Sequence, residues 1–368
     1  MGLPWKTFIT MPVAGKRRRA KGGVLSFDAA VGAVLLLAGA ACLDFVVGDP
    51  WGWLHPVQVM GWVIGWYSDR MIRLGPKPRV MKLAGVLLAV LVIGGTFGVS
   101  AVGLSLLAKI SPVLRWVCEW VLLASCFAGR SLRQAAEDVL QPLSRVNSGA
   151  NSGANAEADL VCARETLSRY VGRDTAQLSA SEVRRAVLET VSENAIDGVF
   201  SPLFYAICGS LLGWAAPVAL AYKAASTLDS MVGYREAPYT DLGWFSAQFE
   251  DVLTWVPCRI SVLSVALLSG RARTVLRLCW RDARADPSPN AGWSECAYAA
   301  ALGVQLGGAN TYRGKVKVKP ILGEAMRPIT AEVIGQALRL TRWSFLVGLI
   351  IGIGMLFSMR QLSYLPYV

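Results

Sequence analysis

Long apolar blocks separated by polar blocks are the dominant pattern in this chain. The clearest apolar runs cover residues 27–47, 83–107, 112–128, 252–268 and 343–359. Each reaches the roughly 17 residues that a helix needs to cross the hydrocarbon layer of a bilayer. A shorter apolar segment, residues 51–67, lies between the first two runs. The pattern predicts an all-α, polytopic membrane protein with cytoplasmic helical segments.

Residues 1–24 form a basic extension in front of the first apolar run. That run ends in Asp44 and Gly48-Asp49-Pro50 instead of a small-residue cleavage site, which favours a retained helix over a signal peptide. The positive-inside rule predicts that the basic extension stays in the cytoplasm. We expect residues 25–128 to form membrane helices.

Two polar stretches, residues 129–198 and 271–342, are predicted to be cytoplasmic because they are rich in charge. The first contains two helical patterns separated by the repeated letters SGAN. Such low-complexity sequence cannot bury an apolar core, so we expect a disordered insertion at 147–159 without function. The last apolar run and the tail, residues 343–368, return to the membrane.

The segment 199–270 is predicted to hold broken membrane helices and an acidic loop. Its first part, residues 199–221, is apolar but interrupted by Pro202, Gly209, Gly213 and Pro217. These breaks predict bent or re-entrant helices whose freed backbone groups line a cavity. Residues 223–251 then have the composition of an acidic loop. Charge counting favours the outside for this loop, whereas a cytoplasmic site requires re-entrant flanking segments or a loop at membrane depth. The sequence leaves its sidedness open.

The stretch just before this segment carries the strongest candidate chemistry. Ser179 and Glu182 have the spacing of a capping box, so a helix is predicted to start there and to end at Gly198. Three acids recur on one face of that helix: Glu189, Glu193 and Asp197. Like charges at this spacing repel one another, increasingly so as water is removed. A cation is expected opposite them.

The acidic stripe has two possible interpretations. It is either a solvated helix face neutralised by Arg184 and Arg185, or a site for Mg²⁺ and a reacting group. The interpretation as a site is favoured because an apolar segment begins directly after the stripe, which places the acids at the membrane surface. Further acids stand at similar boundaries later in the chain: Asp229, Glu250 and Asp251.

The polar stretch 271–342 begins with a dense run of arginines, which favours the cytoplasm. A rigid turn at 286–293 is predicted to lead into a helix that ends at Gly307-Gly308. A helix start can bind a phosphate, although by spacing alone a plain N-cap turn is favoured. Basic residues then alternate along a short exposed strand: Arg313, Lys315, Lys317 and Lys319.

Composition excludes several classes of protein. The 368 residues are 54% hydrophobic with a mean hydropathy of +0.44, too apolar for an ordinary soluble enzyme. The net charge is +12, and the basic residues lie between the apolar runs instead of forming a basic domain. This distribution favours binding to anionic lipid and small anions over binding to nucleic acid. The eight cysteines include no C-x-x-C pair and the one histidine is His55, so a zinc centre is not expected. A P-loop is also absent.

Seven segments resemble, in order and spacing, the adenosylcobinamide-phosphate synthases of cobalamin biosynthesis, a family of integral membrane proteins. They are LDFVVGDPWGWLHPVQVMGW (43–62), ARETLSRYVGRDT (163–175), ETVSENAIDGVFSPLFY (189–205), YKAASTLDSMVGY (222–234), FEDVLTWVPCR (249–259), RDARADPSPNAGW (281–293) and LGVQLGG (302–308). Each motif is weak alone, but the ordered set is specific and covers nearly all of the chain after about residue 40.

Four features depart from the family pattern. The basic segment 1–24 and the SGAN repeat are additions. Glu250-Asp251 stands where the family more often has two aspartates, and Asp286 stands where a histidine is common.

The resemblance implies an ATP-dependent ligase that joins adenosylcobyric acid to (R)-1-amino-2-propanol or its O-phosphate, with Mg²⁺ and through an acyl phosphate. Such chemistry needs a metal, cations on the transferred phosphoryl group and a proton acceptor. The residues proposed as catalytic are Glu189, Glu193, Asn194, Asp197, Asp229 and Asp251, and Glu193, Asp197 and Asp251 are the proposed metal ligands. The residues proposed to bind ATP or substrate are Asp49, His55, Arg173, Asp174, Lys223, Ser230, Arg259, Arg281, Asp282, Ser288 and Asn290.

Two other functions remain open: a transporter of a small anionic or corrinoid molecule, because acids among broken helices also mark ion pathways, and a membrane-embedded phosphotransferase. The expected location is the cell membrane with the active site facing the cytoplasm. The sequence does not decide whether the amine is phosphorylated, how many metal ions bind, which acid is the base, or whether the protein is a homo-oligomer.

Overall fold

The computed structural model describes residues 27–48, 55–147 and 154–362. The helices of the first half are α1 (Phe27–Val46), α2 (Pro56–Leu74), α3 (Pro78–Ile110), α4 (Pro112–Ala124), α5 (Gly129–Asn147), α6 (Ala154–Ser168) and α7 (Ala180–Ala195). A π-helical turn, η1 (Ile196–Phe200), joins α7 to α8 (Ser201–Leu212) and α9 (Ala215–Val232). The second half has α10 (Trp244–Leu268), α11 (Ala272–Asp282), a 3₁₀ turn η2 (Ala283–Ala285), α12 (Ala291–Leu302), β1 (Gln305–Tyr312), β2 (Lys315–Gly323) and α13 (Ala331–Leu362).

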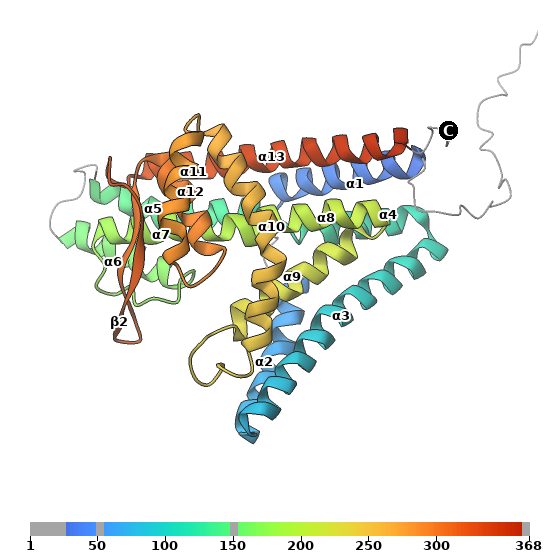
Figure 1. Ribbon diagram of the computed structural model, residues 1–368, viewed down its shortest axis with the longest axis horizontal. Coiled ribbons are helices and arrows are strands. Elements are labelled where there is room, and N and C mark those ends of the chain that lie inside the picture. Colours follow the sequence, from blue (N-terminus) through green and yellow to red (C-terminus); the bar gives the residue numbers. More distant parts are fainter. Residues whose placement is uncertain (1–26, 49–54, 148–153, 363–368) are drawn as a thin grey trace, which may run out of the picture.

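Two regions are apparent along the long axis (Figure 1). In one region α1, α8 and α13 run alongside one another with α4, while α2 and α3 slope away from them. In the other region α5, α6, α7, α11, α12 and the β-hairpin gather together, and α10 crosses between the two. The hydrophobic core is divided in the same way into a bundle cluster and a cluster around α7 and α12.

The outer surface of the bundle is apolar. Among the described residues, five helical stretches are long and apolar enough to cross a membrane: Pro78–Ile110, Pro112–Arg145, Ala180–Leu212, Trp244–Leu268 and Ala331–Ser358. On α3 the large side chains of Leu83, Val99 and Val102 are mostly exposed, and such a surface is stable only when lipid covers it. The protein is therefore an all-α polytopic membrane protein, as predicted, with one two-stranded hairpin added.

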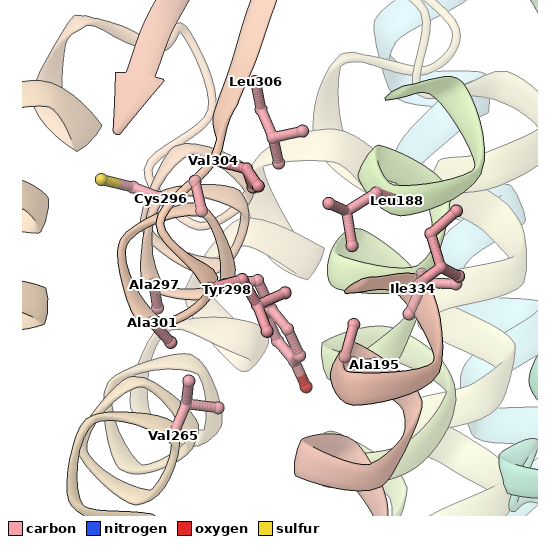
Figure 2. Close-up of a cluster of buried hydrophobic side chains, with 14 of the residues drawn as sticks. Leu188, Ala195, Val265, Cys296, Ala297, Tyr298, Ala301, Val304, Leu306 and Ile334 are labelled. Atoms are coloured by element: carbon pink, nitrogen blue, oxygen red, sulfur yellow. The ribbon is translucent and has the colours of Figure 1, made fainter. Parts of the chain in front are cut away.

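The second core cluster holds the α7 region together (Figure 2). Leu188 of α7, Tyr298 of α12 and Ile334 of α13 meet in it, each at most 1% exposed. The Tyr298 hydroxyl and the Thr341 hydroxyl lie 2.6 Å apart and form a hydrogen bond. Because α7 and α12 pack against this cluster, the polar side chains on their other faces have fixed positions.

The start of α7 confirms the predicted capping box, but the predicted end is wrong. Ser179 accepts a hydrogen bond from the Glu182 N–H, and Glu182 accepts one from the Ser179 N–H. The helix does not stop at Gly198. It continues through η1 into α8, and a Cβ at Gly198 would lie 3.0 Å from the Cβ of Ala128. This glycine allows close packing and does not act as a C-cap.

Of the interruptions predicted in residues 199–221, only the one at Gly213 ends a helix. Pro202 lies in the first turn of α8, where a missing N–H is tolerated, and Pro217 lies near the start of α9. The chain reverses at Gly213, whose φ is 76°, so α8 and α9 form a helical hairpin. The predicted acidic loop 223–251 is also wrong in extent, because α9 continues to Val232 and α10 begins at Trp244.

Two further boundaries correct the sequence interpretation. The helix after the 286–293 turn ends at Leu302 with Gly303 at a φ of 66°, and residues 305–312 form β1 instead. The strand predicted from alternating basic residues exists as β2 and pairs antiparallel with β1. Of the insertion predicted at 147–159, residues 148–153 lie outside the described residues, whereas residues from Ala154 onward are helical in α6.

Gly85 of α3 packs directly against the backbone of Leu242. A Cβ at this position would overlap the carbonyl oxygen of Leu242, which is itself buried. We expect Gly85→Ala to lower the apparent melting temperature in detergent by several degrees, because α3 must move away from the loop that precedes α10. Gly94→Ala is the control, since a Cβ there meets nothing within 4 Å. Equal melting of the two variants would contradict this packing.

Candidate functional site

A cavity of about 200 Å³ lies where α7, η1, the end of α9, the start of α10 and the start of α12 meet. Its polar lining residues are Glu193, Asp197, Asp229, Arg235, Glu250, Asp251, Ser288, Asn290 and Ser294. These residues come from four segments that are distant in the sequence. The structure therefore brings the acids of the predicted stripe together with those that follow it.

The cavity is strongly acidic. Five of its lining side chains are carboxylates and Arg235 is the one lining cation among the described residues. Lys223, on α9, lies close enough to Asp197 to interact with it electrostatically. Crowded carboxylates with so little compensation favour the binding of a cation, whether a metal ion or a substrate ammonium.

Glu250 lines the cavity and is 7% exposed. The Thr254 hydroxyl donates a hydrogen bond to its Oε1, and the Tyr222 hydroxyl lies 3.4 Å from the same oxygen. Tyr222 in turn stacks on Tyr205 with the ring centroids 4.8 Å apart. The carboxylate therefore has a fixed orientation, which reduces the cost of ordering it around a ligand.

Asn290 also lines the cavity and is held by hydrogen bonds to α10. Its Nδ2 donates to the backbone carbonyl of Asp251 at 2.8 Å, while its Oδ1 accepts from Nη1 of Arg259 at 2.8 Å. The Ser288 hydroxyl lies 3.4 Å from Oδ1 of Asp251 and accepts hydrogen bonds from the N–H groups of Asn290 and Ala291. This loop thus fixes Asp251 on the cavity side and Arg259 on its far side.

Glu189, the first acid of the predicted stripe, does not line the cavity. It is 1% exposed and forms ion pairs with Arg173 and Arg185. Its Oε1 also accepts a hydrogen bond from the Gly307 N–H at 3.0 Å. Arg185 is further bound to the carbonyl of Gly307. Glu189 and Arg173 therefore join α7 to β1, and the role proposed for each at the reacting centre has no support from their positions.

Several other proposed binding residues have structural partners away from the cavity. Asp174 accepts hydrogen bonds from the N–H groups of Arg313 and Gly314 at the tip of the hairpin. Arg281 pairs with Asp282 and with Glu324, and Asp282 also accepts from the Gly323 N–H. The attachment of Asp282 to the hairpin and to Arg281 lowers the pKa of its carboxyl, although partial burial opposes this effect.

The remaining proposed residues are also placed. His55 caps α2, with Nδ1 accepting from the Val57 N–H at 3.2 Å. Asn194 is exposed and donates to the Thr190 carbonyl, and the Ser230 hydroxyl donates to the Ser226 carbonyl. Neither Asn194 nor Ser230 lines the cavity. Asp49 lies outside the described residues.

A buried ion pair adjoins the cavity on the side of the hairpin. Lys319 of β2 lies 2.9 Å from Oε1 of Glu295, which is fully buried on α12. Burial raises the pKa of Glu295 to about 8, and Lys319 opposes this shift. Burial also disfavours the Lys319 ammonium, but Glu295 and Glu193 outweigh it and raise the pKa of the lysine. Lys319 thus interacts electrostatically both with this buried acid and with Glu193 of the cavity.

Sequence reasoning gave no role to Glu250, Arg235 or Ser294, which all line the cavity. Glu250 was detectable as the neighbour of Asp251, and Arg235 as the single cation in the short segment between the acids of α9 and α10. Ser294 carried no signal. It is 1% exposed and donates a hydrogen bond to the carbonyl of Ser192, which depends on the packing of α12 against α7.

The cavity acids do not form a closed metal cage. No three acidic, histidine or cysteine side chains of the described residues are arranged closely enough to hold a metal ion. The oxygen donors nevertheless suit Mg²⁺, which is usually bound by one or two carboxylates together with water and phosphate oxygens. The donor set therefore fits a magnesium ion that arrives with a phosphate ligand.

The Glu189 network yields a stability prediction. We expect Arg173→Gln to lower the apparent melting temperature markedly, because the buried carboxylate of Glu189 loses one of its two ion-pair partners. Breaking a buried ion pair typically lowers the free energy of unfolding by on the order of 3 kcal/mol. Arg281→Gln is the control, because the Arg281 side chain is 53% exposed and should matter little. A differential scanning fluorimetry series in detergent compares them. If the two variants melt alike, the buried pair does not hold the hairpin to α7.

Comparisons with known proteins identify the family. A model of the family described as "CobD/Cbib protein" matches residues 37–341. The cobalamin biosynthesis protein CobD of Synechocystis sp. is 46% identical over 330 residues, covering 89% of this chain and 93% of the relative. The cobalamin biosynthesis protein CbiB of Salmonella choleraesuis is 40% identical over 302 residues, covering 81% and 89%. No solved structure matches. This chain therefore belongs to the CobD/CbiB family.

Proposed function

We propose that this protein acts in cobalamin biosynthesis as an ATP-dependent amide ligase that joins adenosylcobyric acid to (R)-1-amino-2-propanol or its O-phosphate. The family membership supports the pathway. The observation that carries the chemistry is the convergence of five carboxylates on one small cavity, with a fixed serine and asparagine in its wall.

The acids suit the amine substrate in two ways. An ammonium ion is attracted to crowded carboxylates and can donate its hydrogens to them in charge-assisted hydrogen bonds. The amine must also lose a proton before its nitrogen can attack a carbonyl, and a carboxylate within hydrogen-bond reach can accept that proton. We assign this task to Glu193 or Asp229, which line the cavity and form no ion pair within the described part of the chain.

The same donor set suits magnesium. The three ligands proposed from the sequence, Glu193, Asp197 and Asp251, are not close enough among the described residues to hold the ion together. We expect one or two of them to hold it together with phosphate oxygens. When bound, the ion neutralises the charge that develops on the transferred phosphoryl group. Arg235 lines the cavity from the α9–α10 loop and supplies the cationic contact of the protein to that group.

The size of the cavity limits which parts of the substrates enter it. A volume of about 200 Å³ accepts a small amine or a phosphate tail, but not a corrinoid. The ring of adenosylcobyric acid must therefore stay outside and extend its carboxylate inward. This arrangement suits an enzyme that modifies one side chain of a large substrate, because the protein needs to surround only the reacting atoms.

The proposed reaction has two steps. The corrinoid carboxylate takes the γ-phosphoryl group of ATP and ADP leaves. The nitrogen of the amine then bonds to the acyl carbon, and inorganic phosphate leaves with the former carboxylate oxygen and takes one proton of the nitrogen. The other proton, lost by the ammonium before the attack, passes to a carboxylate of the cavity. The protein contributes by holding the amine and the phosphates within reach of each other and by accepting this proton.

We place the protein in the cytoplasmic membrane with the cavity open to the cytoplasm, because ATP is on that side. Ser230, exposed on α9 one residue after Asp229, provides a test. Ser230→Cys should react with an impermeant maleimide in inverted vesicles and not in intact cells. The exposed Cys42 and Cys162 must first be replaced to remove background. Labelling in intact cells only would reverse the proposed orientation.

A reconstitution assay tests the reaction. Purified full-length protein in lipid nanodiscs is incubated with ATP, Mg²⁺, adenosylcobyric acid and either aminopropanol or its phosphate. We expect ADP release that depends on both corrinoid and amine, together with a new amide detected by mass spectrometry. ATP left intact with every combination of corrinoid and amine would count against the ligase.

Within this assay Glu193→Gln is the decisive variant. Glu193 is exposed in the cavity, so the amide should leave the fold intact while removing a ligand and proton acceptor. We expect turnover to fall about a hundredfold or more, the usual effect of losing a general base. Glu137→Gln is the control, because Glu137 forms an exposed ion pair with Arg133 on α5. Near-normal turnover of the Glu193 variant would remove this residue from the mechanism.

A further inference from the structure

A second cavity adjoins the acidic one and differs from it in chemistry. It is a wide cleft of about 620 Å³ between α10, α11 and the segment that precedes α12. Its lining residues include Trp255, Arg259, Trp280, Arg284, Asp286 and Trp293. Three indoles and two guanidinium groups make this cleft aromatic and cationic, and its volume lies in the usual range for a drug-sized ligand.

Arg259 is held rigidly at the inner edge of the cleft. Its guanidinium lies between the rings of Trp255 and Trp293, 4.9 Å and 4.8 Å from their centroids. Nη1 donates to Oδ1 of Asn290 and Nη2 donates to the carbonyl of Pro289, each at 2.8 Å. These partners are neutral, so they orient the guanidinium without cancelling its charge. A stacked guanidinium with a fixed edge is well suited to a phosphate oxygen.

Trp280 and Asp286 supply contacts of another kind. Trp280 is 63% exposed, with one face covered by Arg284, whose Cζ lies 3.7 Å from the ring centroid. Oδ1 of Asp286 accepts from the Ser288 N–H at 2.8 Å. Its Oδ2 is buried and has no hydrogen-bond partner among the described residues. The cleft therefore offers a stacking surface and an acceptor that lacks a donor.

A single loop separates the cleft from the acidic cavity. Ser288 lines both. From the acidic side Arg235 donates to the carbonyl of Pro287 at 3.1 Å, and from the cleft side Arg259 donates to the carbonyl of Pro289. Two guanidinium groups thus bind this short loop from opposite sides. A ligand with an aromatic end and an anionic chain can lie in the cleft and cross the loop into the acidic cavity.

We propose that this cleft binds the nucleoside part of an adenine nucleotide, with its base on Trp280 and its phosphates passing Arg259 and Ser288 toward the carboxylates. This inference rests on the proposed ATP-dependent function and names where the nucleotide lies. Asp286 Oδ2 can accept a hydrogen bond either from the exocyclic amino group of the base or from a ribose hydroxyl. The negative phosphates would be repelled by the carboxylates of the cavity. A magnesium ion bound to the end of the triphosphate would offset this repulsion.

The chemistry of the cleft favours this ligand over the corrinoid. Stacking on an exposed indole needs a flat, unhindered ring, which a nucleobase has and a corrin ring with bulky substituents on both faces lacks. The corrinoid is also too large for the cleft to enclose. An interfacial anchor would explain an exposed tryptophan, but it gives no reason for a buried acceptor without a partner.

Binding measurements on the full-length protein in nanodiscs test the inference. The probes are ATP with Mg²⁺ and inorganic tripolyphosphate with Mg²⁺, the second of which has the phosphates but neither base nor ribose. Trp280→Leu and Asp286→Asn are the variants. Trp343→Leu is the matched control, because Trp343 is 58% exposed on α13 and does not line the cleft.

We expect Trp280→Leu to raise the Kd of ATP by roughly tenfold, the loss typical of one base–aromatic stack, and Asp286→Asn to raise it as well through the loss of one hydrogen-bond acceptor. Both variants should leave tripolyphosphate binding unchanged. The control should bind both probes as the native protein does. An unchanged Kd for ATP in both variants, or an equal loss for both probes, would overturn the inference. So would a variant that loses affinity for adenosylcobyric acid and not for ATP.

The outcome is separable from that of the proposed function. If the native protein makes the amide with ATP and the cleft variants still bind ATP normally, the ligase stands and the location of the nucleotide is wrong. If the native protein releases no ADP with any substrate pair, the ligase itself is wrong, whatever the variants bind.

Discussion

The constraint on which this structure depends is the repulsion among carboxylates at the edge of an apolar scaffold. Five acids line one small cavity, and the described part of the chain places a single arginine in its lining. Such an arrangement costs stability in the free protein, because little water or counter-charge compensates it. Proteins retain costly clusters of this kind where a cation must bind, and the rest of the fold can be understood as the frame that keeps the acids together.

That frame consists of buried ion pairs and packed helices on either side of the cavity. Glu189 with Arg173 and Arg185 joins α7 to β1, and Glu295 with Lys319 joins α12 to β2. The β-hairpin is therefore tied to two of the helices that carry the cavity. On the far side the loop at Ser288 and Asn290 is fixed by hydrogen bonds from Arg235 and Arg259. This loop separates an acidic cavity from an aromatic, cationic cleft, so two opposite chemistries lie next to each other.

Much of the architecture follows from local pattern. Four of the five long apolar runs lie in described helices that are long and apolar enough to cross a membrane, whereas the run 27–47 forms a shorter apolar helix. The S-x-x-E spacing predicted the start of α7, and the alternating basic residues predicted β2. Helix ends were harder to predict, because a glycine stops a helix only if the next segment leaves its axis. Gly198 instead packs against Ala128 and the helix continues, whereas Gly213 and Gly303 adopt positive φ and end theirs. The Lys223–Val232 part of α9 was predicted to be loop because it is polar, but it is helical and two of its polar residues, Ser226 and Thr227, are buried.

By itself the sequence determined the class of the protein, its family resemblance and which acids were candidates, since these depend on composition, spacing and motif order. Tertiary structure decided which acid does what. Glu189 and Glu193 stand four residues apart on one helix face, yet one is neutralised by two arginines from α7 and the segment before it while the other opens into the cavity. The difference arises from what packs opposite each turn of α7, namely β1 at Glu189 and the α9–α10 and α12 segments at Glu193. Contacts between segments so distant in the chain leave no trace in local sequence.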